Sequence, residues 1–262
     1  MAELTPSDHP SPALLLQGRR LLITGGARGL GLAFAQHLAA HGARLVIADL
    51  RAELAEQTAA TLRAAGQDVQ ALALDLADPA SVAACAAQAT ALLGGLDGLV
   101  NNGAITDSGG RDSAQIEIDT WDRVMQVNVR GTWLMSNACR TALAASGRGA
   151  TVNLASDTAL WGAPRLMAYV ASKGAVMAMT RSLAREFGAD NIMMNAIAPG
   201  LVEVEATRYV PAERHAHYVK QRAPQRAQLP ADVSGAVVYA LSDLARFVTG
   251  QTLVVNGGFV MN

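Results

Sequence analysis

The sequence predicts one α/β domain in which helices cover both faces of a seven-stranded parallel sheet. Short apolar segments alternate with longer, often alanine-rich segments along nearly the whole chain of 262 residues. This alternation is typical of parallel strands joined by crossover helices. A glycine-rich turn at residues 25–31 connects the first apolar segment to the first alanine-rich one, as in doubly wound sheets.

Each strand of the sheet is predicted by a short apolar run, and each helix by the longer segment between two runs. The predicted strands are residues 20–24, 44–48, 69–73, 97–100, 150–154, 192–197 and 252–255. The predicted helices are residues 29–41, 52–65, 79–93, 119–145, 166–187 and 230–242. Asp78-Pro79 and the segment 229–232 place a proline in the first turn of a helix, where it is favoured.

The alternating pattern also predicts the domain boundaries. No linker divides it, so we expect a single domain at residues 17–262, preceded by a flexible polar arm at residues 1–16. Residues 201–229 interrupt the pattern with a long, charged stretch. Long loops in compact domains are often lids over binding sites. We expect a lid here, and an insertion without fixed structure is the alternative.

Composition argues against several classes of function. The net charge of −1 and the lack of a basic run give no electrostatic basis for binding nucleic acid. No apolar stretch approaches the roughly 20 residues of a membrane span, and the first residues lack a signal-peptide pattern. Two cysteines make no disulfide framework, and no histidine is paired at metal-ligand spacing. We therefore expect a cytoplasmic protein without a metal or a membrane partner.

The glycine-rich turn has the features of a phosphate-binding site. Gly25, Gly29 and Gly31 allow a tight turn and a close approach of the backbone to a pyrophosphate. The helix that follows offers unpaired N–H groups and the positive end of its dipole. Asp49 ends the second strand, at about the separation expected of the acid that binds an adenine ribose. The expected ligand is therefore a dinucleotide.

Tyr169 and Lys173 are four residues apart in a predicted helix, so their side chains lie on one face. A free tyrosine, with a pKa of about 10, is a poor acid or base near neutrality. A nearby ammonium favours the phenolate and lowers that pKa, so the tyrosine can exchange protons at working pH. Taken alone, the pair has an alternative reading as an exposed lysine beside a packed tyrosine.

Further polar residues follow the predicted strands, and ligands of such sheets bind outside the carboxyl ends of the strands. These residues are Asn101 and Asn102 after the fourth strand, Ser156 after the fifth, and Pro199-Gly200 after the sixth. Asn128 lies in the long helix before the strand that leads to Ser156. We expect these side chains to meet the tyrosine and the lysine at one edge of the sheet.

In these motifs and their order, the chain resembles the short-chain dehydrogenase/reductase family over nearly its whole length. The motifs are Thr24-Gly25-x-x-x-Gly29-x-Gly31, Asn101-Asn102-Gly103-Ala104, the tetrad Asn128, Ser156, Tyr169 and Lys173, and Pro199-Gly200. The resemblance implies a Rossmann-type, doubly wound fold. It also implies hydride transfer between a nicotinamide cofactor and the carbon of a hydroxyl or carbonyl group.

The resemblance implies a role for each residue of the tetrad. Tyr169 would be the general acid–base, and Lys173 would lower its pKa and bind the nicotinamide ribose. Ser156 would hydrogen-bond the substrate oxygen, and Asn128 would hold a water in a proton relay to Lys173. The residues expected to contact the cofactor are Thr24, Gly25, Arg28, Gly29, Leu30, Gly31, Asp49, Asp75, Leu76, Asn102, Gly103, Ala104, Tyr169, Lys173, Pro199, Gly200 and Val202.

The choice between NAD and NADP depends on two residues. Asp49 favours NAD, because a carboxylate accepts hydrogen bonds from both ribose hydroxyls and repels a 2′-phosphate. Arg28 favours NADP, since a basic residue at this place is common in family members that use it. Direct repulsion outweighs a solvated arginine, so we expect NAD. Asp75 resembles the family's adenine-contacting aspartate, and a helix N-cap is the alternative for it.

The chain departs from the family pattern at two places. Gly103-Ala104 reverses the usual Ala-Gly order, and both residues are small enough to keep the backbone path. Val204 stands where the family often has a threonine that binds the nicotinamide carboxamide. The main chain of Val202, or the segment beyond it, would then have to supply that contact.

The substrate is predicted from apolar side chains near the tetrad. Leu160, Trp161 and Met167 lie close to Ser156 and Tyr169 in the sequence, and Tyr209 lies in the expected lid. These residues indicate an apolar or ring-bearing alcohol, as in the bacterial NAD-dependent secondary-alcohol dehydrogenases that the chain resembles. The resemblance also implies a homotetramer. The alternatives are an NADPH-dependent ketoacyl-thioester reductase and a non-catalytic nucleotide-binding regulator.

Overall fold

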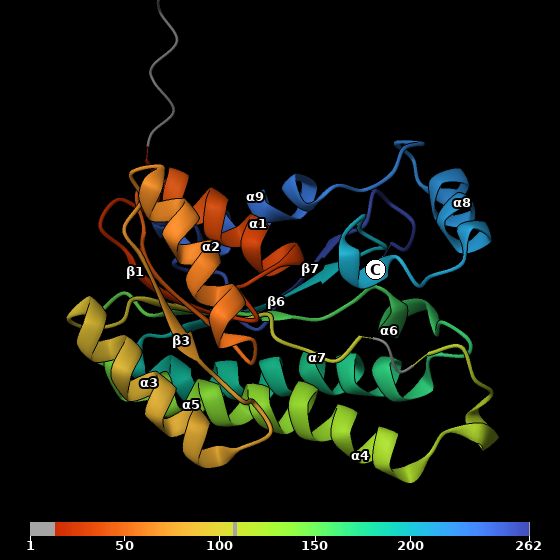
Figure 1. Cartoon of the computed structure of the whole chain (residues 1–262), viewed down its shortest axis with the longest axis horizontal. Coiled ribbons are helices and arrows are strands. Elements are labelled where there is room, and N and C mark those ends of the chain that lie inside the picture. Colours follow the sequence, from red (N-terminus) through yellow and green to blue (C-terminus); the bar gives the residue numbers. More distant parts are fainter. Residues whose placement is uncertain (1–13, 107–108, 262) are drawn as a thin grey trace, which may run out of the picture.

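Seven parallel strands form one sheet at the centre of the computed structural model, which describes residues 14–106 and 109–261 (Figure 1). The strands are β1 (Arg20–Thr24), β2 (Arg44–Asp49), β3 (Val69–Ala73), β4 (Gly98–Asn101), β5 (Ala150–Leu154), β6 (Met193–Pro199) and β7 (Thr252–Val255). Their order is β3-β2-β1-β4-β5-β6-β7. The predicted doubly wound sheet is thus confirmed. The strand order reverses between β1 and β4, which is where such sheets bind ligands.

Helices cover both faces of the sheet (Figure 1). One layer holds α1 (Gly29–Ala40), α2 (Ala52–Ala64) and α9 (Pro230–Leu241), and the other holds α3 (Pro79–Leu93), α5 (Thr132–Ala145) and α7 (Met167–Phe187). Leu21 and Ile23 of β1 belong to the buried core under the first layer, and Leu22 belongs to the core under the second. This alternation follows from the two-residue period of a strand. It explains why the strands are apolar throughout.

The predicted helix at 119–145 is interrupted in the structure. It consists of α4 (Ile118–Met125), a π-helical turn (Gln126–Gly131) and α5. Single π-helical turns insert a residue into a helix and occur frequently at functional sites. Asn128 lies in this turn. Gly131 packs so tightly that a Cβ there would lie 2.8 Å from the main-chain oxygen of Leu76, which places the turn directly against the segment that follows β3.

The segment 201–229 is ordered, so the alternative of an insertion without fixed structure is wrong. It contains a short 3-10 turn (Glu205–Thr207) and α8 (Ala212–Gln221), and α8 lies beside α6 (Thr158–Trp161) at one end of the molecule (Figure 1). The sequence pattern predicted neither α6 nor α8, because both helices are short. Residues 1–13 of the predicted arm lie outside the described residues. Leu16 is fully buried in the core, so the domain begins earlier than residue 17.

The edge of the sheet opposite the carboxyl ends of the strands is held by a buried charge. Asp97 is fully buried and accepts hydrogen bonds from the guanidinium groups of Arg20, at 2.9 Å, and Arg148, at 3.1 Å. Burial alone would raise the pKa of Asp97, but these hydrogen bonds outweigh it and hold the pKa well below its ordinary value. The pair of arginines therefore stabilises the ionised carboxylate.

The predicted helix starts are confirmed at both proline positions. The carboxylate of Asp78 accepts a hydrogen bond from the N–H of Ala80 at 2.9 Å, and that of Asp232 accepts one from the N–H of Leu229 at 2.8 Å.

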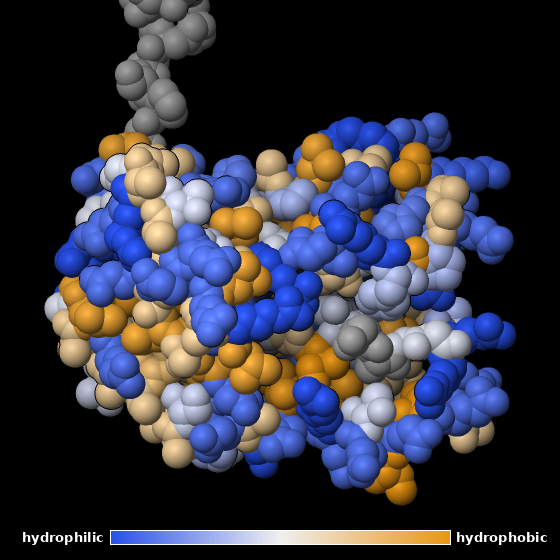
Figure 2. Space-filling model, in the orientation of Figure 1, coloured by the Kyte–Doolittle hydropathy of each residue, from blue (hydrophilic) through white to orange (hydrophobic). Residues whose placement is uncertain are grey.

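Figure 2 shows that hydrophilic residues cover most of the visible face, with apolar side chains interspersed. In the described part of the chain, no helix is both long and apolar enough to cross a membrane.

Candidate active site

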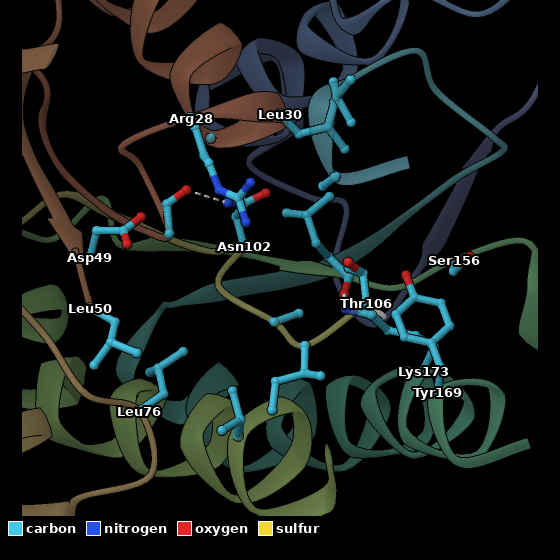
Figure 3. Close-up of a pocket in the computed structure, with 18 of the residues that line it drawn as sticks. Arg28, Leu30, Asp49, Leu50, Leu76, Asn102, Thr106, Ser156, Tyr169 and Lys173 are labelled. Atoms are coloured by element: carbon cyan, nitrogen blue, oxygen red, sulfur yellow. Dashed lines mark hydrogen bonds between the residues drawn. The ribbon is translucent and has the colours of Figure 1, made fainter. Parts of the chain in front are cut away.

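The carboxyl ends of six strands, β1 to β6, open onto one cavity of about 930 Å³. Figure 3 shows its two ends: Asp49 and Leu76 lie at one, and Ser156, Tyr169 and Lys173 lie at the other. Most of the residues predicted to contact the cofactor line it, namely Gly25, Arg28, Leu30, Gly31, Asp49, Asp75, Leu76, Asn102, Ala104, Tyr169, Lys173, Pro199, Gly200 and Val202. The elongated shape connects the predicted ribose site to the predicted catalytic residues.

The glycine-rich turn packs against the segment that follows β4. A Cβ on Gly31 would lie 2.0 Å from the main-chain oxygen of Gly25, and a Cβ on Gly25 would lie 2.7 Å from Gly103. Gly25 also has a φ of +64°, which favours glycine. The side-chain amide of Asn102 donates to the main-chain oxygens of Thr24, at 3.0 Å, and Gly25, at 2.9 Å. The glycines therefore fix the turn at the start of α1.

Three residues predicted to contact the cofactor, Thr24, Gly29 and Gly103, are not among those that line the cavity. The hydroxyl of Thr24 is buried and accepts hydrogen bonds from the N–H groups of Asn102, at 3.1 Å, and Gly103, at 3.0 Å. Gly29, with a φ of +56°, begins α1. These residues shape the turn from behind, and the reversed Gly103-Ala104 pair keeps the close packing.

Asp49 lies at the end of β2 in a position set by the main chain. Its carboxylate accepts hydrogen bonds from the N–H groups of Ala27, at 3.2 Å, and Arg51, at 3.0 Å. Leu50 and Leu76 line the cavity beside it (Figure 3). Leu50 is 66% exposed. A carboxylate next to two apolar side chains is suited to a ribose and an aromatic base.

Asp75 also lines the cavity. Its carboxylate accepts a hydrogen bond from the N–H of Ala77 at 2.8 Å, which closes a local turn. The N-cap of α3 is Asp78. The alternative interpretation of Asp75 as a helix N-cap is therefore wrong.

The segment 201–229 forms one wall of the cavity and contacts the opposite wall twice. The Arg28 guanidinium lies 3.9 Å from the carboxylate of Glu205. The hydroxyl of Tyr209 donates a hydrogen bond to the main-chain oxygen of Thr106. A carboxylate oxygen of Glu205 also lies 3.6 Å from the place where a Cβ of Gly29 would be. An acidic side chain thus lies beside the start of α1.

Tyr169 and Lys173 share one face of α7, as predicted. The Lys173 ammonium is 5.6 Å from the centre of the Tyr169 ring and donates a hydrogen bond to the main-chain oxygen of Leu154 at 2.6 Å. Burial lowers the pKa of Lys173 to about 8. Burial raises the pKa of Tyr169, and hydrogen bonding with Ser156 opposes part of that rise. The expected lowering of the Tyr169 pKa is therefore not present in this structure, because burial dominates.

Ser156 lies at the end of β5, and the hydroxyl of Tyr169 points toward it (Figure 3). Its oxygen accepts hydrogen bonds from the hydroxyl of Thr158, at 2.9 Å, and from the N–H of Thr158, at 3.3 Å. These bonds fix the rotamer of a side chain that is almost fully buried. The serine and tyrosine hydroxyls together form a pair of hydrogen-bonding groups at the end of the cavity.

Asn128 does not line the cavity but supports it from behind. Its amide oxygen accepts from the N–H of Ile105 at 2.8 Å, and its amide nitrogen donates to the oxygen of Ile105 at 3.0 Å. The same nitrogen donates to the hydroxyl of Ser172 at 3.1 Å. Asn128 thus ties the π-helical turn, the segment after β4 and α7 together.

The predicted substrate residues separate into two groups. Tyr209 lines the cavity, whereas Leu160, Trp161 and Met167 do not. Trp161 instead packs edge-on against Tyr218 and Phe259, with ring centres 6.3 and 5.6 Å away. Met167 is 40% exposed. Leu160 and Trp161 lie on the short helix α6, and Met167 begins α7; proximity in the sequence could not reveal that these side chains lie outside the cavity.

Several lining residues were missed by the sequence reasoning. Among them are Leu50, Ile105, Thr106, Val127, Glu205 and Thr207. Most of them lie in irregular segments whose residue types follow no pattern. An exposed leucine directly after Asp49 was the one usable signal. Thr207 lies near Val204, but its hydroxyl donates to the main-chain oxygens of Val202, at 2.6 Å, and Val204, at 2.9 Å.

These residues fit a nicotinamide dinucleotide. Gly29 and Gly31 place no side chains of their own at the start of α1, and a helix start favours phosphate. Asp49 and the two leucines suit an adenosine at one end. Tyr169, Lys173 and Ser156 supply a proton donor and acceptor at the other end, where hydride chemistry would take place.

Comparisons with known proteins agree with this geometry. A family model described as "Enoyl-(Acyl carrier protein) reductase" matches residues 25–260. The 2-(S)-hydroxypropyl-CoM dehydrogenase 3 of Xanthobacter autotrophicus is 35% identical over 253 residues, which cover 93% of this chain and 97% of that protein. The 3-alpha-(or 20-beta)-hydroxysteroid dehydrogenase of Mycobacterium tuberculosis is 37% identical over 246 residues, which cover 94% of this chain and 90% of that protein.

A solved structure gives the same result. The gluconate 5-dehydrogenase of Burkholderia cenocepacia, in complex with NADP and tartrate, has a TM-score of 0.89 and 33% identity, and the match covers 94% of this chain and 96% of that chain. The match to the family model extends over the glycine-rich turn, the tetrad and the C-terminal strand alike. The chain therefore belongs to the short-chain dehydrogenase/reductase family, whose members are oxidoreductases that use a nicotinamide cofactor.

Proposed function

We propose that this protein is an NAD-dependent dehydrogenase that interconverts a secondary alcohol and its ketone, with Tyr169 as the general acid–base. One observation carries the proposal. The hydroxyl of Tyr169 points toward Ser156, at the end of a cavity whose other end is at Asp49 (Figure 3). Tyr169 also shares a face of α7 with Lys173, whose ammonium is buried. The curated relatives that match are dehydrogenases of diverse alcohols, which supports a shared chemistry at a CH–OH group.

The chain's residues divide the work of proton transfer. Ser156, held by Thr158, donates a hydrogen bond to the substrate oxygen and orients it toward Tyr169. Tyr169 accepts the hydroxyl proton during oxidation and returns it during reduction. The cation of Lys173, on the same helix face, favours the phenolate, whereas burial of Tyr169 opposes it. When bound, the nicotinamide takes up the hydride in oxidation and supplies it in reduction.

Asn128 has a supporting role in this proposal. Its side-chain amide is fully engaged by Ile105 and Ser172. Its main-chain oxygen accepts a hydrogen bond from the hydroxyl of Thr132 at 2.8 Å, and a carbonyl oxygen has a second lone pair. We therefore assign the proposed water of the relay to this main-chain oxygen and the side chain to positioning.

NAD is the proposed cofactor because of the arrangement at the ribose end. The carboxylate of Asp49 is oriented by two main-chain N–H groups, so it is preorganised to accept from ribose hydroxyls and to repel a 2′-phosphate. Arg28 supports the alternative of an NADPH-dependent ketone or ketoacyl-thioester reductase. Its guanidinium, however, lies beside Glu205 at 3.9 Å, which partly neutralises its charge.

The proposed substrate is an uncharged secondary alcohol with apolar or ring-bearing substituents. Near the catalytic residues the cavity is lined by Thr106 (Figure 3), by Tyr209, which hydrogen-bonds to it, and by Ala155, which precedes Ser156. None of these side chains carries a formal charge at neutral pH. A carboxylate or a phosphate on the substrate would therefore lack a pairing cation among them.

We also propose a homotetramer. Large apolar side chains are exposed on α5 and near the C-terminus: Trp133 is 47% exposed, Phe247 is 102% exposed and Met261 is 82% exposed. Exposed apolar side chains of this size favour a covering partner. Native mass spectrometry should give a four-chain species, and a monomer at micromolar concentration would contradict this assignment.

A titration of the purified protein with NADH and NADPH, followed by a panel of secondary alcohols, tests the proposed function. We expect tight NADH binding, weaker NADPH binding and NAD-dependent oxidation at alkaline pH. Tight NADPH binding with ketone reduction would instead support the reductase alternative. Binding of neither cofactor would contradict both.

A further inference from the structure

An acidic residue, Asp157, is buried directly beside the catalytic serine, Ser156. Asp157 is 0% exposed and follows Ser156 at the start of α6. It does not line the cavity, and the proposed chemistry does not use it. A buried carboxylate is costly unless it is hydrogen-bonded, so its partners indicate why it is there.

Three other segments of the chain converge on Asp157. The hydroxyl of Tyr218, on α8, donates to one carboxylate oxygen at 3.1 Å, and the amide of Asn256, after β7, donates to the other at 3.4 Å. The main-chain N–H of Asp157 donates to the oxygen of Pro199, at the end of β6, at 2.9 Å. One side chain thus joins the strand ends of the active site to α8.

An aromatic cluster surrounds the hydrogen bond from Tyr218. The ring of Phe259 stacks on Tyr218 with centres 4.1 Å apart, and the indole N–H of Trp161 donates to the Tyr218 hydroxyl at 3.2 Å. Tyr218 is 2% exposed. The cluster excludes water from the carboxylate, which strengthens every charge interaction there.

The charged and titratable groups around Asp157 come from two helices, α7 and α8. Arg222, at the end of α8, lies 5.1 Å above the Tyr218 ring and attracts the carboxylate. Tyr218 faces it from the same helix, and Arg214 acts on Tyr218 from one turn before it. Tyr169 of α7 points toward Ser156, the neighbour of Asp157 in the chain (Figure 3), and the charge of Asp157 raises the pKa of Tyr169. Burial raises the pKa of Asp157 itself to about 7, against the effect of its hydrogen bonds.

We propose that Asp157 is a positioning residue that anchors Ser156 and α8 to each other and whose negative charge opposes ionisation of Tyr169. The inference rests on the proposed function, since it concerns the same proton transfer. Like charges close together in a dry region cannot both form without cost. The ionised carboxylate therefore keeps Tyr169 protonated, which favours reduction, and the neutral acid eases formation of the phenolate, which favours oxidation.

The test is the pH profile of kcat/KM for alcohol oxidation in Asp157→Asn, beside the wild type. Asparagine has nearly the same shape and carries no charge at any pH. The rising limb of the profile, along which Tyr169 loses its proton and becomes active as the base, should move to lower pH by roughly half a unit or more. The matched control is Glu213→Gln, which removes an exposed carboxylate from the same α8 and should leave the limb in place.

Tyr218→Phe is a second variant that covers a failure of Asp157→Asn to fold. It keeps the ring stack with Phe259 but removes one hydrogen bond from the carboxylate. Asp157 then stays neutral over a wider range, so the limb should move in the same direction by a smaller amount. A limb that does not move in either active variant overturns the proposal, even if activity falls, because a uniform loss indicates only structural support.

The proposed function fails in a different way. If the proposed function is wrong, neither the wild type nor Glu213→Gln will oxidise a secondary alcohol with NAD, and the inference is then wrong as well. If the wild type is active but the limb does not move in Asp157→Asn or Tyr218→Phe, only the inference is overturned. The two failures are therefore distinguished by the wild type and the control.

Discussion

The ammonium of Lys173 lies 5.6 Å from the centre of the Tyr169 ring, and it is anchored by a 2.6 Å hydrogen bond to the main-chain oxygen of Leu154. The lysine therefore acts on the tyrosine as a fixed charge and not as a direct proton donor in this structure. Its anchor is the end of β5, two residues before Ser156. The strand that positions the serine thus also positions the cation.

The buried charge of Lys173 predicts a pH dependence of stability. Burial lowers the pKa from its ordinary value of 10.5 to about 8. Between these two pH values the unfolded chain holds a proton that the folded chain has released, so the contribution of this group to stability rises with pH. Subtracting the free energy of unfolding of Lys173→Met from that of the wild type should give a difference that increases from pH 8 to 10.5. A flat difference would show that the ammonium is not desolvated.

Asp49→Ala should change cofactor preference. A hydrogen bond to a charged group contributes about 1.5–3 kcal/mol, so NADH binding should weaken roughly ten- to hundredfold. NADPH binding should stay equal or improve, because a repulsive charge is removed. Fluorescence titrations with both cofactors measure the change. An equal loss for both would show that Asp49 does not bind the ribose.

Glu205→Gln should strengthen binding of the dinucleotide. The carboxylate of Glu205 lies beside the start of α1, where a pyrophosphate is expected. Removing a negative charge from a helix N-terminus that binds phosphate is worth about 0.3–1 kcal/mol, or roughly two- to fivefold in Kd. Glu203→Gln, an exposed neighbour, is the control and should leave Kd unchanged. Weaker binding in Glu205→Gln would mean that the carboxylate helps to hold the cofactor.

Asp97→Ala should destabilise the fold without affecting the site. Removing one partner of a buried ion pair costs about 3–5 kcal/mol, because the guanidinium groups of Arg20 and Arg148 lose their partner. The control is Asp68→Ala, whose pair with Arg44 is exposed and is worth about 0–1 kcal/mol. Urea unfolding measures both. The effect of Asp97 should also vanish in acid, since its lowered pKa adds stability above about pH 4, the pKa of an unperturbed aspartate, which is lost as the pH falls.

The sequence predicted the fold and the shared helix face of Tyr169 and Lys173 well because both depend on local patterns. Apolar runs defined all seven strands to within two residues at either end, and Tyr169 and Lys173 met on one face because a helix fixes that geometry. The glycine-rich turn and Asp49 were equally local. Each of these features is determined by spacing along the chain.

The substrate wall could not be predicted because it depends on tertiary contacts. Trp161 was expected in the cavity, but it packs against Tyr218 and Phe259, which lie 57 and 98 residues further along the chain. The partners of Asp157 are equally remote. The π-helical turn at Asn128 was missed because its residue pattern differs little from that of a regular helix. Direct interaction of distant segments determined the positions of Trp161 and Asp157.

Tyr169→Phe tests the central claim most directly. The variant lacks only the hydroxyl, so cofactor binding and the fold should remain nearly unchanged. We expect NAD-dependent oxidation of a secondary alcohol to fall by at least about a hundredfold, since general acid–base catalysis contributes roughly 10²–10⁴, while the Kd for NADH stays within about twofold. Activity close to that of the wild type, with the same pH profile, would contradict the assignment of Tyr169 as the acid–base.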